Sequence, residues 1–185
     1  DFGIALMLGH EPSEAIESSE HVEGTPAYLP PEQSGRVHRV IDYRSDYYSF
    51  GAMLYHMVAG QVPFPGEDAQ AVIAAHIGRS PQPLHELVPK TPRMLSALIA
   101  KLLSKAAEGR YQSAHGLRAD LSRCLLEYRG SGTIGEFTLA AQDRSSVLRP
   151  PQKLYGRNQE QQLLWSAFEE ARRGGHEVVL LTGTA

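Results

Sequence analysis

Residues 45–58 restrict the possible folds of this chain most strongly, because a helix formed by them is apolar on almost every side. A helix on a protein surface has one apolar stripe, whereas a helix that is apolar all round is buried. Ser45-Asp46 predicts the N-terminal cap of this helix, and Gly60 with Pro63 predicts its end. Its apolar residues are Tyr47, Tyr48, Phe50, Met53, Leu54, Tyr55, Met57 and Val58. The sequence therefore predicts a helix in the interior of a domain.

Three further segments in this half of the chain predict helices. Residues 69–77 place apolar side chains at i, i+3, i+4, i+7 and i+8. Thr91-Pro92 predicts an N-cap followed by proline at the first helical position, ahead of a leucine-rich stripe. Ser113 predicts the cap of another amphipathic helix. Residues 3–35 show little periodicity and predict a long loop.

The pattern changes over residues 130–153, where GSGTIGEF and RSSVLRPPQK predict a linker. Residues 154–185 then show a second pattern. Asn158 predicts the cap of an amphipathic helix that ends at a pair of glycines, and residues 177–182 predict a buried strand. One helix and one strand cannot bury a core alone. We therefore expect a second domain that begins here and is cut off.

Composition excludes several classes of protein. The net charge of -3 gives no electrostatic basis for a nucleic-acid partner. Cys124 is the single cysteine, so no internal disulfide can form, which is typical of a reducing cytosol. No uncharged stretch approaches the roughly 20 residues that cross a bilayer. We therefore expect a cytoplasmic chain with no nucleic-acid partner and no membrane segment within these residues.

Short motifs occur in a fixed order along the first 129 residues. They are DFG at 1–3, GTPAYLPPE at 24–32, SDYYSFG at 45–51, GQVPF at 60–64, and Arg110-Tyr111 between two predicted helices. This succession resembles the second half of a eukaryotic-type (bacterial Hanks-type) serine/threonine protein kinase. The resemblance covers residues 1–129. It implies a mainly α fold, the helical C-terminal lobe of a kinase, which is incomplete here.

The resemblance also implies roles for individual residues, with ATP and Mg²⁺ as cofactors. Asp1 would hold the Mg²⁺ that bridges the nucleotide phosphates. Thr25 would line the groove where the substrate hydroxyl docks. Glu32 and Arg110 would form a buried ion pair that ties the activation loop to the helical lobe. Asp46 would accept hydrogen bonds from the backbone of the catalytic loop.

Residues 154–185 resemble the start of a signalling P-loop ATPase of the AAA/STAND type. Gly156-Arg157 and Glu160 precede or open the predicted helix, and Gly183 takes the place of the first glycine of GxxxxGK[ST]. This resemblance implies an α/β P-loop NTPase domain that is truncated within its phosphate-binding loop. A kinase joined to an ATPase resembles the large bacterial hybrids that also carry a sensor histidine kinase.

The catalytic equipment of a kinase is not found among the 185 residues: a Gly-rich loop, a strand lysine with its helix glutamate, and HRDxxxxN. We therefore expect an internal piece of a longer protein that is inactive alone. The parent would transfer the γ-phosphate of ATP to serine or threonine of protein substrates. Its other partners would be its own N-terminal lobe and the downstream ATPase. The alternative is a pseudokinase that regulates the ATPase by docking, without catalysis.

Overall fold

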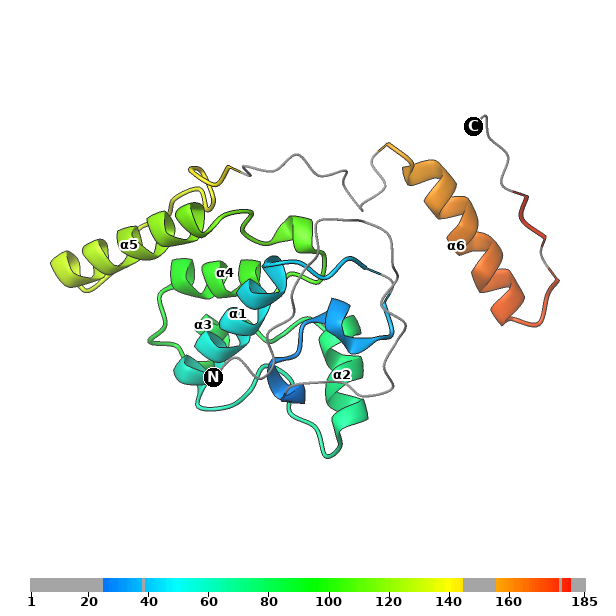
Figure 1. The fold of residues 1–185 in the computed structure, drawn as a ribbon, viewed down its shortest axis with the longest axis horizontal. Coiled ribbons are helices and arrows are strands. Elements are labelled where there is room, and N and C mark those ends of the chain that lie inside the picture. The colour runs from blue at the N-terminus through cyan, green and yellow to red at the C-terminus, as the bar shows by residue number, and fades with distance from the viewer. Residues whose placement is uncertain (1–24, 38, 145–155, 177, 181–185) are drawn as a thin grey trace. The chain divides into compact units, whose positions relative to one another are not determined.

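The computed structural model describes residues 25–37, 39–144, 156–176 and 178–180. The chain divides into two compact units, residues 1–150 and 151–185, and each is described by itself. Every element in the described residues is helical (Figure 1). The first unit contains η1 Pro26–Tyr28, η2 Pro31–Ser34, α1 Arg44–Ala59, α2 Ala69–Gly78, α3 Leu84–Leu87, α4 Arg93–Leu102, η3 Ala107–Gly109 and α5 Ala114–Ser131.

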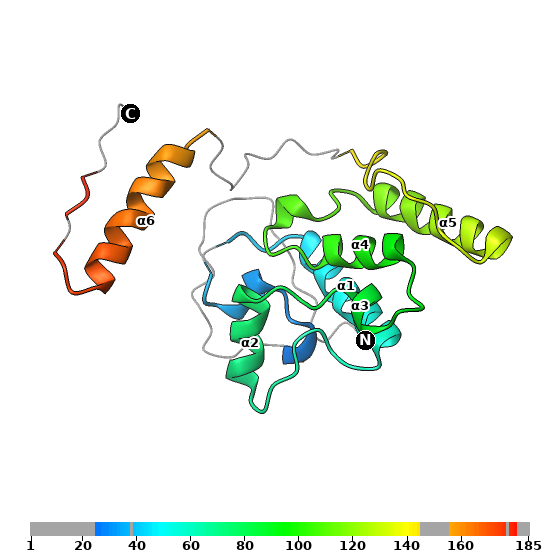
Figure 2. The ribbon, with the colours of Figure 1, turned by 180° about the vertical axis from the view of Figure 1, so that it is seen from behind.

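Helix α1 lies at the centre of the first unit, with α4 and α3 packed against it (Figures 1 and 2). Its buried side chains include Tyr48, Ala52 and Tyr55. The prediction of a helix buried on every side is wrong for one face, because Met57 is 73% exposed and Met53 is also exposed. A helix buries only the sides that other elements cover, and no described element covers that face.

Helices α1 and α4 approach each other closely at Gly51. A Cβ atom at this position would lie 2.6 Å from Cβ of Leu102, which is too close for real atoms. The apolar stripe of α4 and the residue after it fill the core beside this contact, as the sequence predicts: Leu98, Ile99, Leu102 and Leu103 are all buried. Because Gly51 has no side chain, the two central helices can approach this closely.

Two predicted helix ends are confirmed. Gly60 takes the left-handed conformation at φ 71° after α1, and its N–H donates to the carbonyl of His56 at 2.8 Å. Ser113 caps α5, since its Oγ accepts the N–H of Gly116 at 3.0 Å.

Two predicted starts are wrong by a small shift. Helix α1 begins at Arg44 with Tyr43 as its N-cap, so Ser45 is already helical. Helix α4 begins at Arg93 with Pro92 as the cap residue, one position later than Thr91-Pro92 predicts. The Ser45 hydroxyl, which resembles a cap, instead donates to Glu32 Oε1 at 2.7 Å.

The segment after α5 packs on the helical core instead of leaving it. Helix α5 runs to Ser131, and Gly132 ends it at φ 73°. The apolar residues that then contact the core are Ile134, Phe137, Leu139 and Ala140. These residues fall inside the segment 130–153 that the sequence predicts as a linker.

The second unit contains α6 Asn158–Arg172. Arg157 is its N-cap, so Asn158 is the first helical residue instead of the predicted cap. Described residues 178–180 form no strand, contrary to the prediction for 177–182, whose other members lie outside the described part. A strand is defined by pairing with a neighbour, and no described strand is present to pair with. Over the described ranges, the model contains no helix of the length and apolarity that a bilayer crossing requires.

Candidate functional site

Residues 25–34, here called the anchor segment, run across α1 as two short 3₁₀ helices. Each helix starts with proline, at Pro26 and Pro31, where the missing N–H costs nothing. Gly35 follows at φ 68° and ends the second helix in the left-handed conformation. The prolines and a few local hydrogen bonds, such as that from the N–H of Gln33 to the carbonyl of Pro30 at 3.0 Å, therefore fix the path of this segment.

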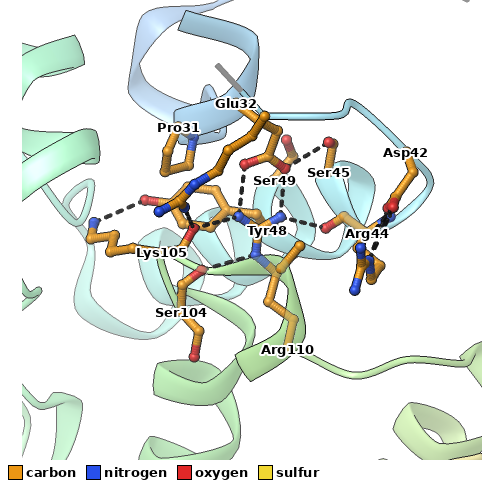
Figure 3. Close-up of polar contacts among 12 residues, drawn as sticks. Pro31, Glu32, Asp42, Arg44, Ser45, Tyr48, Ser49, Ser104, Lys105 and Arg110 are labelled. Carbon is orange, nitrogen blue, oxygen red and sulfur yellow. Dashed lines mark hydrogen bonds and ion pairs between the residues drawn. The ribbon is translucent and has the colours of Figure 1, made fainter. Parts of the chain in front are cut away.

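Glu32 and Arg110 meet in the interior as a two-pronged ion pair, although 78 positions separate them in the sequence (Figure 3). Arg110 Nη1 lies 2.6 Å from Glu32 Oε1, and Nη2 lies 2.8 Å from Oε2. Glu32 is 5% exposed and Arg110 is 1% exposed. Ser45 Oγ donates a further hydrogen bond of 2.7 Å to Glu32 Oε1.

Burial alone would raise the pKa of the Glu32 carboxyl, but Arg110 and Ser45 lower it further than burial raises it. The net effect lowers the pKa of Glu32 below its usual range. Glu32 is therefore charged at neutral pH and paired with a cation. An uncompensated buried charge is costly, so neither partner can be removed without penalty.

Three backbone carbonyls complete the surroundings of Arg110. Its guanidinium donates to the carbonyl of Arg44 at 2.9 Å, of Ser104 at 2.9 Å and of Lys105 at 3.3 Å. The guanidinium also lies 4.9 Å from the ring centroid of Tyr48. Arg110 thus joins the start of α1 and the turn after α4 to the anchor segment.

A second cluster, formed by buried Tyr48 and His76 and half-buried Lys105, lies beside this ion pair. The Tyr48 hydroxyl lies 2.9 Å from His76 Nδ1, and Lys105 Nζ donates to that hydroxyl at 3.2 Å. Lys105 Nζ also donates to the carbonyl of His76 at 2.7 Å and lies 4.3 Å from the ring centroid of Phe64.

Desolvation sets the ionisation of this cluster. Burial, helped by the positive charge of Lys105, lowers the pKa of His76 to about 4. Burial, helped by Arg110, lowers the pKa of Lys105 to about 8. Burial likewise raises the pKa of Tyr48. His76 is therefore a neutral hydrogen-bonding group at physiological pH, and its ring is fixed from both nitrogens.

The anchor segment is held by its backbone as well as by Glu32. His76 Nε2 lies 3.1 Å from the carbonyl of Ala27, and Ser49 Oγ donates to the carbonyl of Tyr28 at 3.0 Å. The Tyr28 hydroxyl lies 2.7 Å from His56 Nδ1. Three attachment points on α1 and α2 therefore fix residues 27 and 28.

The sequence-predicted site residues have different environments. Glu32 and Arg110 are brought together. Thr25 is exposed, and its carbonyl accepts the N–H of Tyr28 at 3.0 Å, which closes η1. Asp46 is exposed in the first turn of α1. Asp1 of the DFG motif and Gly183 both lie outside the described residues.

Sequence reasoning missed the roles of His76, Lys105, Ser45 and Ser49. In the sequence, His76 falls at position i+7 of the stripe over residues 69–77, and Ser45 falls at a predicted helix cap. A titratable ring in the buried stripe of α2 was the available signal, because a buried polar group must find partners. In the described part of the chain, no buried side-chain nitrogen or oxygen lacks one.

Metal ligands do not gather in the described residues: these contain no group of three or more His, Cys, Asp or Glu side chains placed to hold an ion. The arrangement that is present is structural. It fixes a 10-residue segment against a helical lobe through one buried ion pair and a buried histidine.

Several known proteins are similar in sequence to this chain. The serine/threonine-protein kinase PknB of Mycolicibacterium smegmatis is 34% identical over 151 residues, covering 82% of this chain and 23% of that protein. The serine/threonine-protein kinase pkn2 of Myxococcus xanthus is 39% identical over 119 residues, covering 63% of this chain and 14% of that protein.

A third relative is not named as a serine/threonine kinase. The hybrid signal transduction histidine kinase G of Dictyostelium discoideum is 29% identical over 179 residues, covering 84% of this chain and 5% of that protein. The chain thus spans between 5% and 23% of the length of these relatives. The protein kinase domain family matches residues 1–121. The chain belongs to the protein kinase family.

Proposed function

We propose that the protein containing these residues is a serine/threonine kinase, and that residues 25–131 hold the end of its activation loop against the helical lobe. The observation that carries this proposal is the buried, two-pronged ion pair between Glu32 and Arg110. The names of the bacterial relatives support serine and threonine as the acceptors.

The anchor segment gives the substrate side of the site a fixed base. Thr25 is exposed directly before η1, and Ala27 and Tyr28 are held through their carbonyls. We propose that Thr25 faces the substrate hydroxyl, and that the fixed backbone after it limits how far this residue can move. Positioning of this kind accounts for much of phosphoryl-transfer catalysis.

Asp46 is the second residue with a proposed role beyond the lobe. Its carboxylate is exposed in the first turn of α1, a helix whose other residues are mostly apolar. We propose that it accepts hydrogen bonds from the backbone of the catalytic loop. Met53 and Met57 leave an exposed apolar face on the same helix, which other kinase residues would cover.

The reaction is transfer of the γ-phosphoryl group of ATP. A bond forms between the substrate hydroxyl oxygen and the γ-phosphorus, and the bond to the bridging oxygen of ADP breaks. The hydroxyl proton would pass to the aspartate of HRDxxxxN, which is not among the 185 residues. Mg²⁺ would neutralise charge on the phosphates. Asp1 is the residue proposed to hold it, and the described residues add no metal-ligand cluster.

The 185 residues alone are proposed to be inactive, because HRDxxxxN and the phosphate-binding loop are not among them. The test is therefore made on the full-length gene product. It is incubated with γ-labelled ATP, Mg²⁺ and casein, and the phosphoamino acids are identified. We expect phosphoserine or phosphothreonine, with no product from Asp1→Ala and normal product from Glu67→Gln, a charge change at an exposed site.

Two outcomes contradict the proposal. Phosphate transfer that survives Asp1→Ala would remove Asp1 from the site. No transfer by a folded, ATP-binding wild-type protein would favour the alternative, a docking module that regulates its neighbour without catalysis.

We also propose that residues 154–185 begin a signalling P-loop ATPase. Helix α6 exposes a broad apolar face that includes Leu163, Trp165 and Phe168, and Val178 and Leu180 are exposed beyond it. Apolar surface of this extent is typical of an element that packs within a larger domain. The named hybrid relative, which aligns with 84% of this chain, supports a kinase joined to other signalling modules.

ATP binding by the second module is tested separately. A protein extended past Ala185 to the end of that module should bind ATP, and replacement of the lysine of its phosphate-binding loop should abolish binding. An extension without GxxxxGK[ST] would overturn this part of the proposal.

A further inference from the structure

Residues 133–143, here called the strap, run back along α5 in the opposite direction. Gly135 N–H donates to Glu127 Oε2 at 2.8 Å near the end of the helix. The ring of Phe137 lies 4.3 Å from the guanidinium carbon of Arg123, one turn earlier. The strap then reaches the start of α5, where its last residue is bound.

The Asp143 carboxylate accepts two hydrogen bonds at the start of α5. Its Oδ2 accepts the N–H of Gln112 at 2.6 Å, and its Oδ1 accepts the hydroxyl of Ser113 at 2.6 Å. Ser113 is itself the cap of the helix, so Asp143 extends that cap with a negative charge. Charge-assisted hydrogen bonds of this length are among the strong ones.

Gly116 makes room for this carboxylate. A Cβ atom on Gly116 would lie 2.5 Å from Cβ of Asp143 and 2.7 Å from its Cα. Gly130, near the other end of the same helix, has nothing within 4 Å of such an atom. Of the two glycines of α5, only Gly116 therefore lies against the strap.

A second attachment holds the middle of the strap. Ala140 takes the left-handed conformation at φ 62°, and its N–H donates to Asp120 Oδ2 at 2.7 Å. The same buried oxygen accepts the Tyr111 hydroxyl at 2.6 Å. Since non-glycine residues rarely adopt this conformation, surrounding contacts must hold it.

The contacts that begin at Asp143 continue into the ion-pair site. Gln112, whose N–H is held by Asp143, accepts at its Oε1 a 2.8 Å hydrogen bond from Arg44 Nη1. The carbonyl of Gln112 accepts the Tyr43 hydroxyl at 2.7 Å. The carbonyl of Arg44 is in turn bound by Arg110, the partner of Glu32. A continuous series of contacts therefore joins Asp143 to the anchor segment.

We propose that the strap is an integral part of the helical lobe and a coupling element. Asp143 is its latch, the residue through which the segment between the modules positions the Glu32–Arg110 ion pair. The strap lies beyond residue 121, where the match to the kinase family ends. Release of the latch frees Gln112 and loosens the surroundings of Arg44 and Arg110. The inference does not depend on phosphate transfer.

Hydrogen exchange of single backbone amides in the 185-residue chain tests this. Gly116→Ala displaces Asp143, and Gly130→Ala adds the same methyl group to the same helix in open space. We expect exchange at Gln112 and Ala140 to rise at least tenfold in Gly116→Ala and to stay at the wild-type rate in Gly130→Ala. We also expect a smaller rise at Gln33, within the anchor segment, and at Ser45, which donates to Glu32. Asp143→Asn, which keeps the shape of the side chain, is a second variant if Gly116→Ala does not fold.

The outcomes separate the two parts of the proposal. Unchanged exchange at Gln112 and Ala140 in Asp143→Asn and Gly116→Ala would overturn the latch. Faster exchange in the strap with unchanged exchange at Gln33 and Ser45 would overturn the coupling. Equal effects of Gly116→Ala and Gly130→Ala would show that the methyl group acts on the helix, which also contradicts the latch.

Discussion

The guanidinium of Arg110 has five N–H donors, and its five hydrogen bonds use every one of its nitrogens. Two of these bonds go to Glu32 and three go to backbone carbonyls from α1 and from the turn after α4. Lysine offers a single point charge and cannot reproduce this planar arrangement. The residue type is therefore fixed by geometry as well as by charge.

Glu32→Gln should cost about 3–5 kcal/mol in the free energy of unfolding, because it leaves the buried Arg110 charge without its partner. Urea unfolding of the variant and the wild type measures the difference. Glu67→Gln removes the same charge from an exposed position and should change stability by less than about 0.5 kcal/mol. Equal effects of the two variants would contradict the buried ion pair.

His76 should make stability depend on pH between 6.5 and about 4. In this range the unfolded chain binds a proton at His76, while the folded chain, in which the pKa of His76 is about 4, does not. Folding is therefore weakened as pH falls, by about 3 kcal/mol over the whole range. Tyr48 and Lys105 face this ring and stay in their neutral-pH forms here, since Tyr48 has a raised pKa and Lys105 titrates at about 8.

The measurement compares the unfolding free energy of the wild type and of His76→Gln at several pH values. Glutamine offers hydrogen bonds but does not titrate. The carboxylates are common to both proteins, so the difference isolates the histidine. Parallel pH profiles would show that His76 is not buried in its neutral form.

At the scale of elements, the contact between α1 and α4 depends on Gly51. Gly51→Ala should destabilise the lobe by roughly 1–3 kcal/mol, because the new methyl group forces the helices apart at Leu102. Gly78→Ala, at the end of α2 with nothing within 4 Å, should be neutral or stabilise by up to about 1 kcal/mol. Thermal unfolding of both variants is the measurement, and a neutral Gly51→Ala would argue against the close approach.

Local sequence signals predicted where the helices lie more accurately than they predicted the residue at which each helix begins. Gly60 and Ser113 end or begin a helix because each acts on its own backbone within four residues. Ser45 has the chemistry of a cap but donates to Glu32 instead. That choice depends on a carboxylate 13 positions away, which no local pattern reports.

At the scale of the whole molecule, the compact unit that contains the lobe extends well past α5. A chain ending at Pro150 should unfold with the same free energy as the 185-residue chain, because residues 151–185 form a unit of their own. A chain ending at Gly132 should be less stable, on the order of 3 kcal/mol, since it lacks the packed side chains of the strap.

Urea unfolding of the two shortened chains, monitored by circular dichroism at helical wavelengths, gives these values. If the chain ending at Gly132 were as stable as the longer one, residues 133–143 would add nothing to the lobe. If the chain ending at Pro150 were destabilised, the two units would not fold independently.

The amino-acid sequence alone was sufficient to predict a mainly helical protein, the positions of α1, α2, α4, α5 and α6, and, through its motifs, a protein kinase. It also singled out Glu32 and Arg110, through the order of the motifs. The helices are predicted by residue types and by spacings within one or two helical turns. The pairing of Glu32 with Arg110, 78 positions apart, is predicted only through the resemblance to the kinase family.

The folded structure was needed to find the hydrogen bonds of His76 and Lys105, the exposed face of α1, and the attachment of the strap. Asp143 and Gln112 are 31 positions apart, and Arg44 and Gln112 are 68 apart. Contacts over such distances depend on where the folded chain returns, and the Gly- and Ser-rich composition after α5 is equally typical of a linker. The physical reason is that a hydrogen bond is specified by position in space, which local composition does not encode.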